Sequence, residues 1–162
     1  MDAYLAIASR REVRDYAPTP IPEDVRRRIL DAGRLSGSSR NTQLWEFVVP
    51  TPETQQRLAE TVWAPANVAG ATFVVAIVGE AFPFDVGRCS QNMLLAAWNE
   101  GVGACPNGVR DPEAAAELLG GEVKAVLTFG YPATPRDPNR RTAEEWSARA
   151  NRKPLDELVR EA

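Results

Sequence analysis

The longest apolar pattern with helical spacing lies in the middle of the chain, between Phe84 and Gly101. Apolar residues recur there every three or four positions, and from Met93 to Trp98 they occupy all faces. This pattern predicts a central helix that is buried all round. Gly101 can end the helix in a left-handed turn, and residues 102–108, VGACPNG, then predict a loop whose small residues allow close backbone approach to a ligand. An ordinary turn after a well-packed helix is the simpler interpretation of the same residues.

Shorter segments on both sides also show helical spacing or helix-start signals. Residues 2–9 predict a short helix with Tyr4, Leu5 and either Ile7 or Ala8 turned inward. Proline followed by acidic residues is typical of a helix start. Such starts predict helices from Pro22 to about Arg34, from Thr51 with Leu58 and Val62 inward, and from Asp111 to Gly120, and a last short helix is expected at 155–162.

Three segments have strand patterns. Residues 72–79, TFVVAIVG, are dense in β-branched residues and predict a buried strand, while 45–49 and 123–129 predict two more. No strand is followed by a glycine-rich nucleotide-binding motif. Interleaved helices and strands without such a motif indicate a mixed α+β sheet flanked by helices. Residues 133–150, which are charged and contain proline, are expected to be irregular or wrapped on a surface.

Size and charge narrow the possible functions. The chain has 162 residues, which predicts one domain spanning 1–162, and a net charge of -3 argues against a nucleic-acid partner. The longest apolar run, Phe73 to Val78, is too short to span a membrane, and the N-terminus lacks a signal-peptide pattern. A soluble, cytoplasmic protein is therefore expected.

Two observations restrict the chemistry. The sequence contains no histidine, which removes the commonest general base and metal ligand and most zinc chemistry. Cys89 and Cys105 fit no metal-binding spacing and adjoin apolar sequence, so both are expected to be reduced thiols. We expect no metal site.

Two polar clusters could bind a ligand. Arg10, Arg11 and Arg14 follow the first predicted helix, where they could either solvate its C-terminal end or clamp a phosphate. The stretch 36–43, SGSSRNTQ, precedes a strand and could be a solvated turn, or its short donors and acceptors could bind the carbonyls and nitrogens of a heterocycle.

Four stretches taken together resemble the FMN-dependent nitroreductase family. They are SRREVRDY at 9–16, the segment at 20–49, the segment at 84–108, and FGYP at 129–132 with RKPLDELV at 152–159. They follow the order of the family and span nearly the whole chain. The resemblance implies a nitroreductase-like α+β fold, with a central mixed, mainly antiparallel sheet, a buried central helix and an intertwined homodimer that holds FMN at the subunit interface.

The resemblance also assigns residues to the cofactor. Arg10 and Arg11 would lie at the phosphate and ribityl end of FMN, and Arg14 near the pyrimidine edge of the flavin. The polar stretch would reach the flavin of the neighbouring subunit, and the loop at 106–108 would turn a backbone amide to the reactive flavin nitrogen. The full set of implied contacts is Arg10, Arg11, Arg14, Ser38, Ser39, Asn41, Gln43, Asn67, Pro106, Asn107, Gly108, Arg152 and Lys153.

The sequence departs from the family pattern at several positions. Glu12 stands where a small hydroxyl residue is usual, and an acid beside a phosphate is unfavourable unless it turns away or pairs with an arginine. Gly37 and Leu44 replace two common prolines. The short stretch 80–83 replaces helices that cover the flavin in many relatives, so a short, lid-reduced member with an open, shallow site is expected.

The resemblance implies an FMN-dependent NAD(P)H oxidoreductase. Hydride would pass through FMN by a ping-pong route to a nitroaromatic, a quinone or another small acceptor, with no catalytic side chain because the flavin performs the chemistry. Alternatives are heterocycle dehydrogenation, dehalogenation or flavin fragmentation on the same fold, or a non-catalytic flavin-binding protein. The sequence offers no motif that distinguishes NADH from NADPH.

Overall fold

The computed structural model describes residues 1–161. The chain divides into two compact units. The first, the sheet unit, comprises residues 11–136, and the second, the terminal unit, comprises residues 1–10 together with those from 137 onward. The expectation of a single domain over 1–162 stays a prediction.

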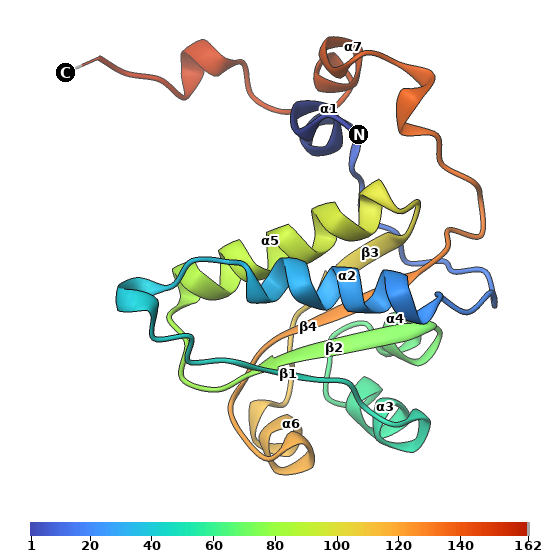
Figure 1. Ribbon diagram of the computed structural model, residues 1–162, viewed down its shortest axis with the longest axis vertical. Coiled ribbons are helices and arrows are strands. Elements are labelled where there is room, and N and C mark those ends of the chain that lie inside the picture. The colour runs from blue at the N-terminus through green and yellow to red at the C-terminus, as the bar shows by residue number, and fades with distance from the viewer. Residues whose placement is uncertain (162) are drawn as a thin grey trace. The chain divides into compact units, whose positions relative to one another are not determined.

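The sheet unit is built around a four-stranded antiparallel sheet (Figure 1). Its strands are β1 (Glu46–Val48), β2 (Phe73–Val78), β3 (Gly103–Asn107) and β4 (Val123–Gly130), in the order β1-β2-β4-β3. All three pairs of neighbouring strands are antiparallel. The only parallel pairing within residues 1–161 is an isolated bridge between Glu12 and Ala104. The α+β fold class and the mainly antiparallel sheet are thus confirmed.

Helices cover both faces of this sheet. In Figure 1, α2 (Glu23–Arg34) and α5 (Pro83–Asn99) lie together on one face, and α3 (Pro52–Ala59), α4 (Pro65–Ala69) and α6 (Pro112–Leu119) lie on the other. Strand β2 is buried along its whole length, and its alternate residues feed two cores: Val75 packs with Ile29 and Met93, while Val74 packs with Leu58. Burial on both faces explains the continuous apolar run.

The sheet unit corrects two predictions from the sequence. Residues 103–107, expected as part of a loop, form the edge strand β3, and Pro65–Ala69, not expected as a helix, forms α4. Within α5, Met93, Leu94, Ala97 and Trp98 are buried as expected, but Leu95 and Ala96 are only half-buried. The helix is therefore not buried on every side within one chain.

The terminal unit contains α1 (Ala3–Ser9), which packs on α7 (Ala143–Ala148) and touches the short turn η2 (Pro138–Arg140). The inward face predicted for α1 is wrong for Tyr4 and Ile7, which are exposed. Leu5 and Ala8 are half-buried, and the buried residues are Ala6 and Ser9.

The region expected to be irregular also contains a helix. Thr142 and Glu145 form a capping box that starts α7, two residues of a pattern that the sequence contains and the prediction missed. The final helix expected at 155–162 is reduced to the 3-10 turn η3 (Leu155–Glu157), and residue 162 lies outside the described residues.

Candidate functional site

The end of β3 presents a short exposed backbone. Pro106 and Gly108 are exposed, whereas Asn107 between them is 8% exposed. Strand β3 is the edge of the sheet, where a proline is tolerated because one side of the strand needs no ladder hydrogen bonds. The predicted ligand-facing residues therefore alternate, with Asn107 turned into the protein and its neighbours at the surface.

The Asn107 amide is held by hydrogen bonds at both ends. Its Nδ2 donates to the carbonyls of Cys105 at 3.1 Å and Val126 at 3.3 Å, and to Thr128 Oγ1 at 3.3 Å. Its Oδ1 accepts from Asn67 Nδ2 at 2.6 Å. Three acceptors around one nitrogen fix the orientation of the Asn107 amide, and this orientation in turn fixes that of Asn67.

The side-chain oxygen of Asn67 is a buried acceptor without a hydrogen-bond donor in the described residues. The residue lies on α4 and is 4% exposed, and its Oδ1 has no hydrogen-bond donor within residues 1–161. A buried carbonyl oxygen without a donor is costly in a folded protein, so such an atom calls for an explanation. Asn67 and Asn107 are two predicted site residues that the structure brings into direct contact.

Tyr16 extends the same network from the N-terminal side of the sheet unit. Its hydroxyl donates to the Val13 carbonyl at 2.7 Å and lies 2.9 Å from Thr128 Oγ1. Burial is the main cause that raises the pKa of Tyr16, so its phenol stays protonated. Because the Val13 N–H also donates to the Ala104 carbonyl at 3.2 Å, the segment carrying Arg11 and Arg14 is fastened along β3.

Glu12, which is half-buried, pairs with Ala104 of β3 through an isolated backbone bridge. Burial raises the pKa of the Cys105 thiol, and the nearby Glu12 carboxylate raises it further. Glu12 also contributes to the raised pKa of Tyr16. The carboxylate is therefore close to Cys105 and Tyr16. Both Cys89 and Cys105 are buried free thiols, as the sequence predicted, and burial raises the pKa of Cys89 to about 11.

Three residues of the polar stretch at 38–43 have a left-handed backbone that is uncommon for residues other than glycine. Arg40, Asn41 and Gln43 have φ values of 52°, 57° and 50°. The Ser38 hydroxyl accepts from the Gln43 N–H at 2.9 Å, and the Ser39 N–H donates to Asp85 Oδ2 at 3.0 Å. Positive φ at such residues is a costly conformation that clusters at ligand sites.

These contacts turn the stretch outward. Asp85 is buried at the start of α5 and anchors the stretch from beneath, while the side chains of Ser39, Asn41 and Gln43 are exposed. The stretch leads into β1, at the sheet edge opposite to β3. Three strand spacings of about 4.8 Å separate the two edge strands, roughly 14 Å in all. Within one chain the sheet thus keeps the polar stretch and the end of β3 apart.

The predicted cationic residues are divided between the two units. Arg11, half-buried, and Arg14, exposed, belong to the sheet unit. Arg10, Arg152 and Lys153 belong to the terminal unit, where the Arg152 guanidinium donates to the Ala150 carbonyl at 3.1 Å. Their convergence on one phosphate stays a prediction.

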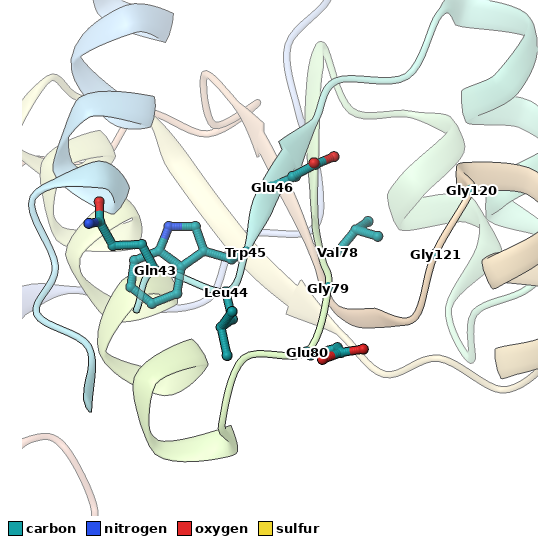
Figure 2. A pocket seen from close by; sticks show the side chains of 9 residues that line it. All are labelled: Gln43, Leu44, Trp45, Glu46, Val78, Gly79, Glu80, Gly120 and Gly121. Carbon is teal, nitrogen blue, oxygen red and sulfur yellow. The ribbon is translucent and has the colours of Figure 1, made fainter. Parts of the chain in front are cut away.

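A cavity of about 330 Å³ lies at the β1 side of the sheet unit (Figure 2). Of the predicted residues only Gln43 lines it; the remaining lining comes from Leu44, Trp45, Glu46, Val78, Gly79, Glu80, Gly120 and Gly121. Gly79 has φ of 128°, and a Cβ there would lie 2.7 Å from the Leu44 carbonyl oxygen, so glycine is needed where the chain leaves β2. This cavity does not reach the end of β3.

Within residues 1–161, no group of three or more His, Cys, Asp or Glu side chains could hold a metal ion. No helix in the same range is long and apolar enough to cross a membrane.

A model of the nitroreductase family matches residues 7–81 and 79–131, well over half of the chain. The chain belongs to the nitroreductase family. The match covers the whole of β1, β2, β3 and β4 and every predicted site residue except Arg152 and Lys153.

Individual relatives agree with this family. A provisionally named NADH dehydrogenase/NAD(P)H nitroreductase of Methanothermobacter thermautotrophicus is 29% identical over 169 residues, covering 90% of this chain and 88% of that protein. A 4-nitrobenzoate reductase of Pseudomonas putida is 45% identical over 53 residues, 33% of this chain and 23% of that protein. The structure of a provisionally assigned nitroreductase from Desulfovibrio desulfuricans in complex with FMN superposes with a TM-score of 0.81 at 26% identity, covering 100% of this chain and 98% of that chain.

Several residues that shape the site in this nitroreductase family member were missed from the sequence. Tyr16 and Thr128 were not considered because a lone tyrosine and a threonine within a strand carry no motif. Asp85 could have been found, since an acid in the first turn of a buried helix often serves a neighbouring backbone N–H. Trp63, which is 71% exposed beside Gly108, was also missed, because a single tryptophan between Val62 and Ala64 carries no motif.

Proposed function

We propose that this protein is an FMN-dependent oxidoreductase that passes hydride from NAD(P)H to a small planar acceptor such as a nitroaromatic or a quinone. The observation that carries the proposal is the exposed, rigidly held backbone at the end of β3, in a chain that belongs to the nitroreductase family. Pro106 and Gly108 stand at the surface, while the Asn107 side chain between them is locked into the buried network. Such a segment offers a fixed backbone to a flat ligand.

The residues present fit a flavin at this position. Asn67 Oδ1 is a buried acceptor without a donor in the described chain, and an isoalloxazine ring carries N–H groups that could supply one. Arg14 is exposed next to the segment fastened along β3, where a positive charge favours an anionic reduced flavin. The similarity to the FMN complex from Desulfovibrio desulfuricans over the whole chain supports the choice of FMN.

The site needs two copies of the chain. The polar stretch and the end of β3 lie at opposite edges of one sheet, and the polar side chains of the stretch point outward from their own chain. A second copy that presents its Ser38, Ser39, Asn41 and Gln43 to the β3 end of the first would complete one site and, by symmetry, a second. The half-buried Leu95 and Ala96 of α5 are suited to burial between the copies.

The cationic residues are assigned to the phosphate of FMN. Arg10 and Arg11 would hold it from the N-terminal side, with Arg152 and Lys153 closing from the C-terminal side. Guanidinium groups bind phosphate oxygens in fixed, often bidentate geometry. The Glu12 carboxylate lies near Cys105 and Tyr16.

The proposed reaction balances without a catalytic side chain. FMN, when bound, supplies the group that accepts hydride from NAD(P)H and returns it to the acceptor. With a quinone, NAD(P)H and one proton give NAD(P)⁺ and the hydroquinone; with a nitroarene, they give NAD(P)⁺, the nitroso compound and water. The protein orients the ring and the acceptor, and the missing histidine is no obstacle.

The first experiment is a visible absorption spectrum of the purified protein after addition of FMN, followed by anaerobic NADPH and, separately, NADH. We expect oxidised-flavin bands that bleach with at least one nucleotide and return when a quinone is added. If FMN binds but neither nucleotide reduces it, the protein is a flavin carrier and the proposed oxidoreductase activity is wrong. Failure to bind FMN at all would refute it.

A further inference from the structure

The connection between α3 and α4 carries a tryptophan against the exposed end of β3. Trp63 is 71% exposed. No other tryptophan in residues 1–161 belongs to the large hydrophobic residues exposed at the surface. Exposed apolar residues that stand singly are common and need no explanation. What distinguishes Trp63 is that its surroundings hold it in one place.

Backbone hydrogen bonds fasten this connection to the residues after β3. The Trp63 N–H donates to the Gly108 carbonyl at 3.0 Å, and Val62 pairs with Val109 in an antiparallel bridge. The Thr61 carbonyl accepts from the N–H groups of Arg110 and Asp111 at 2.7 and 3.0 Å. The backbone of residues 61–63 is therefore tied to residues 108–111.

The indole itself rests on Gly108. A Cβ added at Gly108 would lie 3.1 Å from Trp63 Cδ1 and 3.9 Å from Nε1, so the absent side chain is what lets the ring approach. Four residues further on, Asn67 reaches Asn107 from within the protein. The segment 63–67 thus touches the end of β3 twice, with a buried amide on the inner side and an aromatic ring on the outer side.

We propose that Trp63 is the surface on which the planar acceptor stacks. The inference rests on the function proposed above and adds a specificity-determining residue to it. The connection from β2 to α5 is only residues 79–82 long, so it supplies little cover for a ligand at the site. A quinone or nitroarene has few polar handles, and an aromatic ring gains its affinity mainly from stacking and burial. NAD(P)H, by contrast, has phosphates and riboses that the protein can bind away from Trp63, so its binding depends less on stacking there.

The test compares four variants of the FMN-loaded protein: Trp63→Ala, Trp63→Leu, Trp63→Phe and, as a control, Phe84→Leu. Phe84 is an equally exposed aromatic residue of the sheet unit, on the first turn of α5. Steady-state KM is measured for menadione and nitrofurazone and for ferricyanide, an octahedral ion that cannot stack. The rate of flavin reduction by NAD(P)H and the FMN affinity are measured separately.

The expected result is a specific loss for planar acceptors. KM for menadione and nitrofurazone rises about two- to tenfold in Trp63→Ala and Trp63→Leu, the size expected for a lost aromatic stacking contact, and stays near the original value in Trp63→Phe and Phe84→Leu. Kinetics with ferricyanide, FMN affinity and flavin reduction change less than twofold.

Other outcomes would overturn the proposal. A normal KM in Trp63→Leu would mean that stacking is irrelevant, and an equal loss with ferricyanide would mean that the flavin itself is disturbed. A change confined to flavin reduction would assign Trp63 to the nucleotide donor, and dissociation of the subunits in gel filtration would make it an interface residue.

Failure of the proposed function would appear earlier, in the unmutated protein, as absent FMN binding or absent turnover. The stacking proposal is then decided by binding alone. Menadione should quench the tryptophan fluorescence of the unmutated protein, and the quenching should be smaller in Trp63→Phe because the contribution of Trp63 is gone. Equal quenching in the two proteins would refute the stacking proposal.

Discussion

Asn67 Nδ2 donates a 2.6 Å hydrogen bond to Asn107 Oδ1 and so joins α4 to the edge strand β3, across 40 residues of sequence. Behind this pair the Asn107 Nδ2 is bonded to Thr128, whose hydroxyl lies against Tyr16. The exposed residues on either side of Asn107 are therefore positioned by a side chain that faces away from any ligand. Fixed support of this kind is what a binding segment at a surface requires.

Replacing Asn67 with alanine should destabilise the protein by about 1–3 kcal/mol, because the buried Asn107 Oδ1 loses its donor. Urea unfolding measures the change. The double variant Asn67→Ala, Asn107→Ala should be less destabilised than the sum of the two single variants, since the two residues act as a pair. Strict additivity would show that the pair contributes no coupling. Gln56→Ala, at an exposed residue of α3, is a control expected to change stability little.

Replacing Gly103 with alanine should be destabilising by about 1–3 kcal/mol, the range for overpacking a filled site. The added Cβ would lie 2.7 Å from Val13 Cβ and Cγ2. Because Val13 fastens the segment with Arg11 and Arg14 to β3, FMN affinity should fall as well. The double variant Gly103→Ala, Val13→Ala should recover part of both losses, because it removes the two Cγ atoms of Val13 but keeps its Cβ. If it recovers neither, the conflict with the two Cγ atoms is not the cause.

Replacing Asp85 with alanine should weaken FMN binding about tenfold, the value of one hydrogen bond to a charged group, because Ser39 loses the carboxylate that anchors the polar stretch. Fluorescence titration of apoprotein with FMN measures the affinity. Arg88→Ala is the matched control: it removes the cation 3.9 Å from Asp85 and leaves the contact to Ser39 intact. Equal effects in both variants would assign the role to the ion pair.

Stability should fall with rising pH above about 9. Burial raises the pKa of Cys89 from 9.0 to about 11, so the unfolded chain releases this proton at a lower pH than the folded protein does. Its contribution is complete below pH 9 and is lost as pH rises toward 11. Urea unfolding between pH 8 and about pH 11 should show this slope, and Cys89→Ala should show a shallower one. An unchanged slope in the variant would exclude Cys89 as its source.

Most of the fold could be predicted from the sequence because its signals are local. The apolar stripe of α2, the proline and acidic starts of α3 and α6, and the β-branched run of β2 each lie within one segment. The same applies to the left-handed end of α6 at Gly120. The capping box of α7 is also local but was missed. Another error arose where a segment depends on partners elsewhere. Residues 103–107, with two small residues and a proline, have little strand propensity and are a strand because β4 pairs with them.

The candidate site divides in the same way. The identity of its residues came from the sequence, as a resemblance that carried Asn67, the stretch at 38–43 and the segment at 106–108. The role of each residue did not. The backbone of the segment at 106–108 was expected at the flavin, and the structure adds that the Asn107 side chain is turned inward. The structure also places the Glu12 carboxylate near Cys105. The contact between Tyr16 and Thr128 is visible only in the structure.

The sequence by itself determined most of the helices and strands, namely α2, α3, α5, α6, β1, β2 and β4, and the family to which the chain belongs. The tertiary structure decided that the polar stretch and the end of β3 occupy opposite sheet edges, that Asn67 meets Asn107, and that Trp63 rests on Gly108. The physical reason is the range of the interactions. Periodicity and capping act over a few neighbouring residues, whereas these relationships depend on sheet order and on hydrogen bonds between segments some 40 residues apart, as between Asn67 and Asn107.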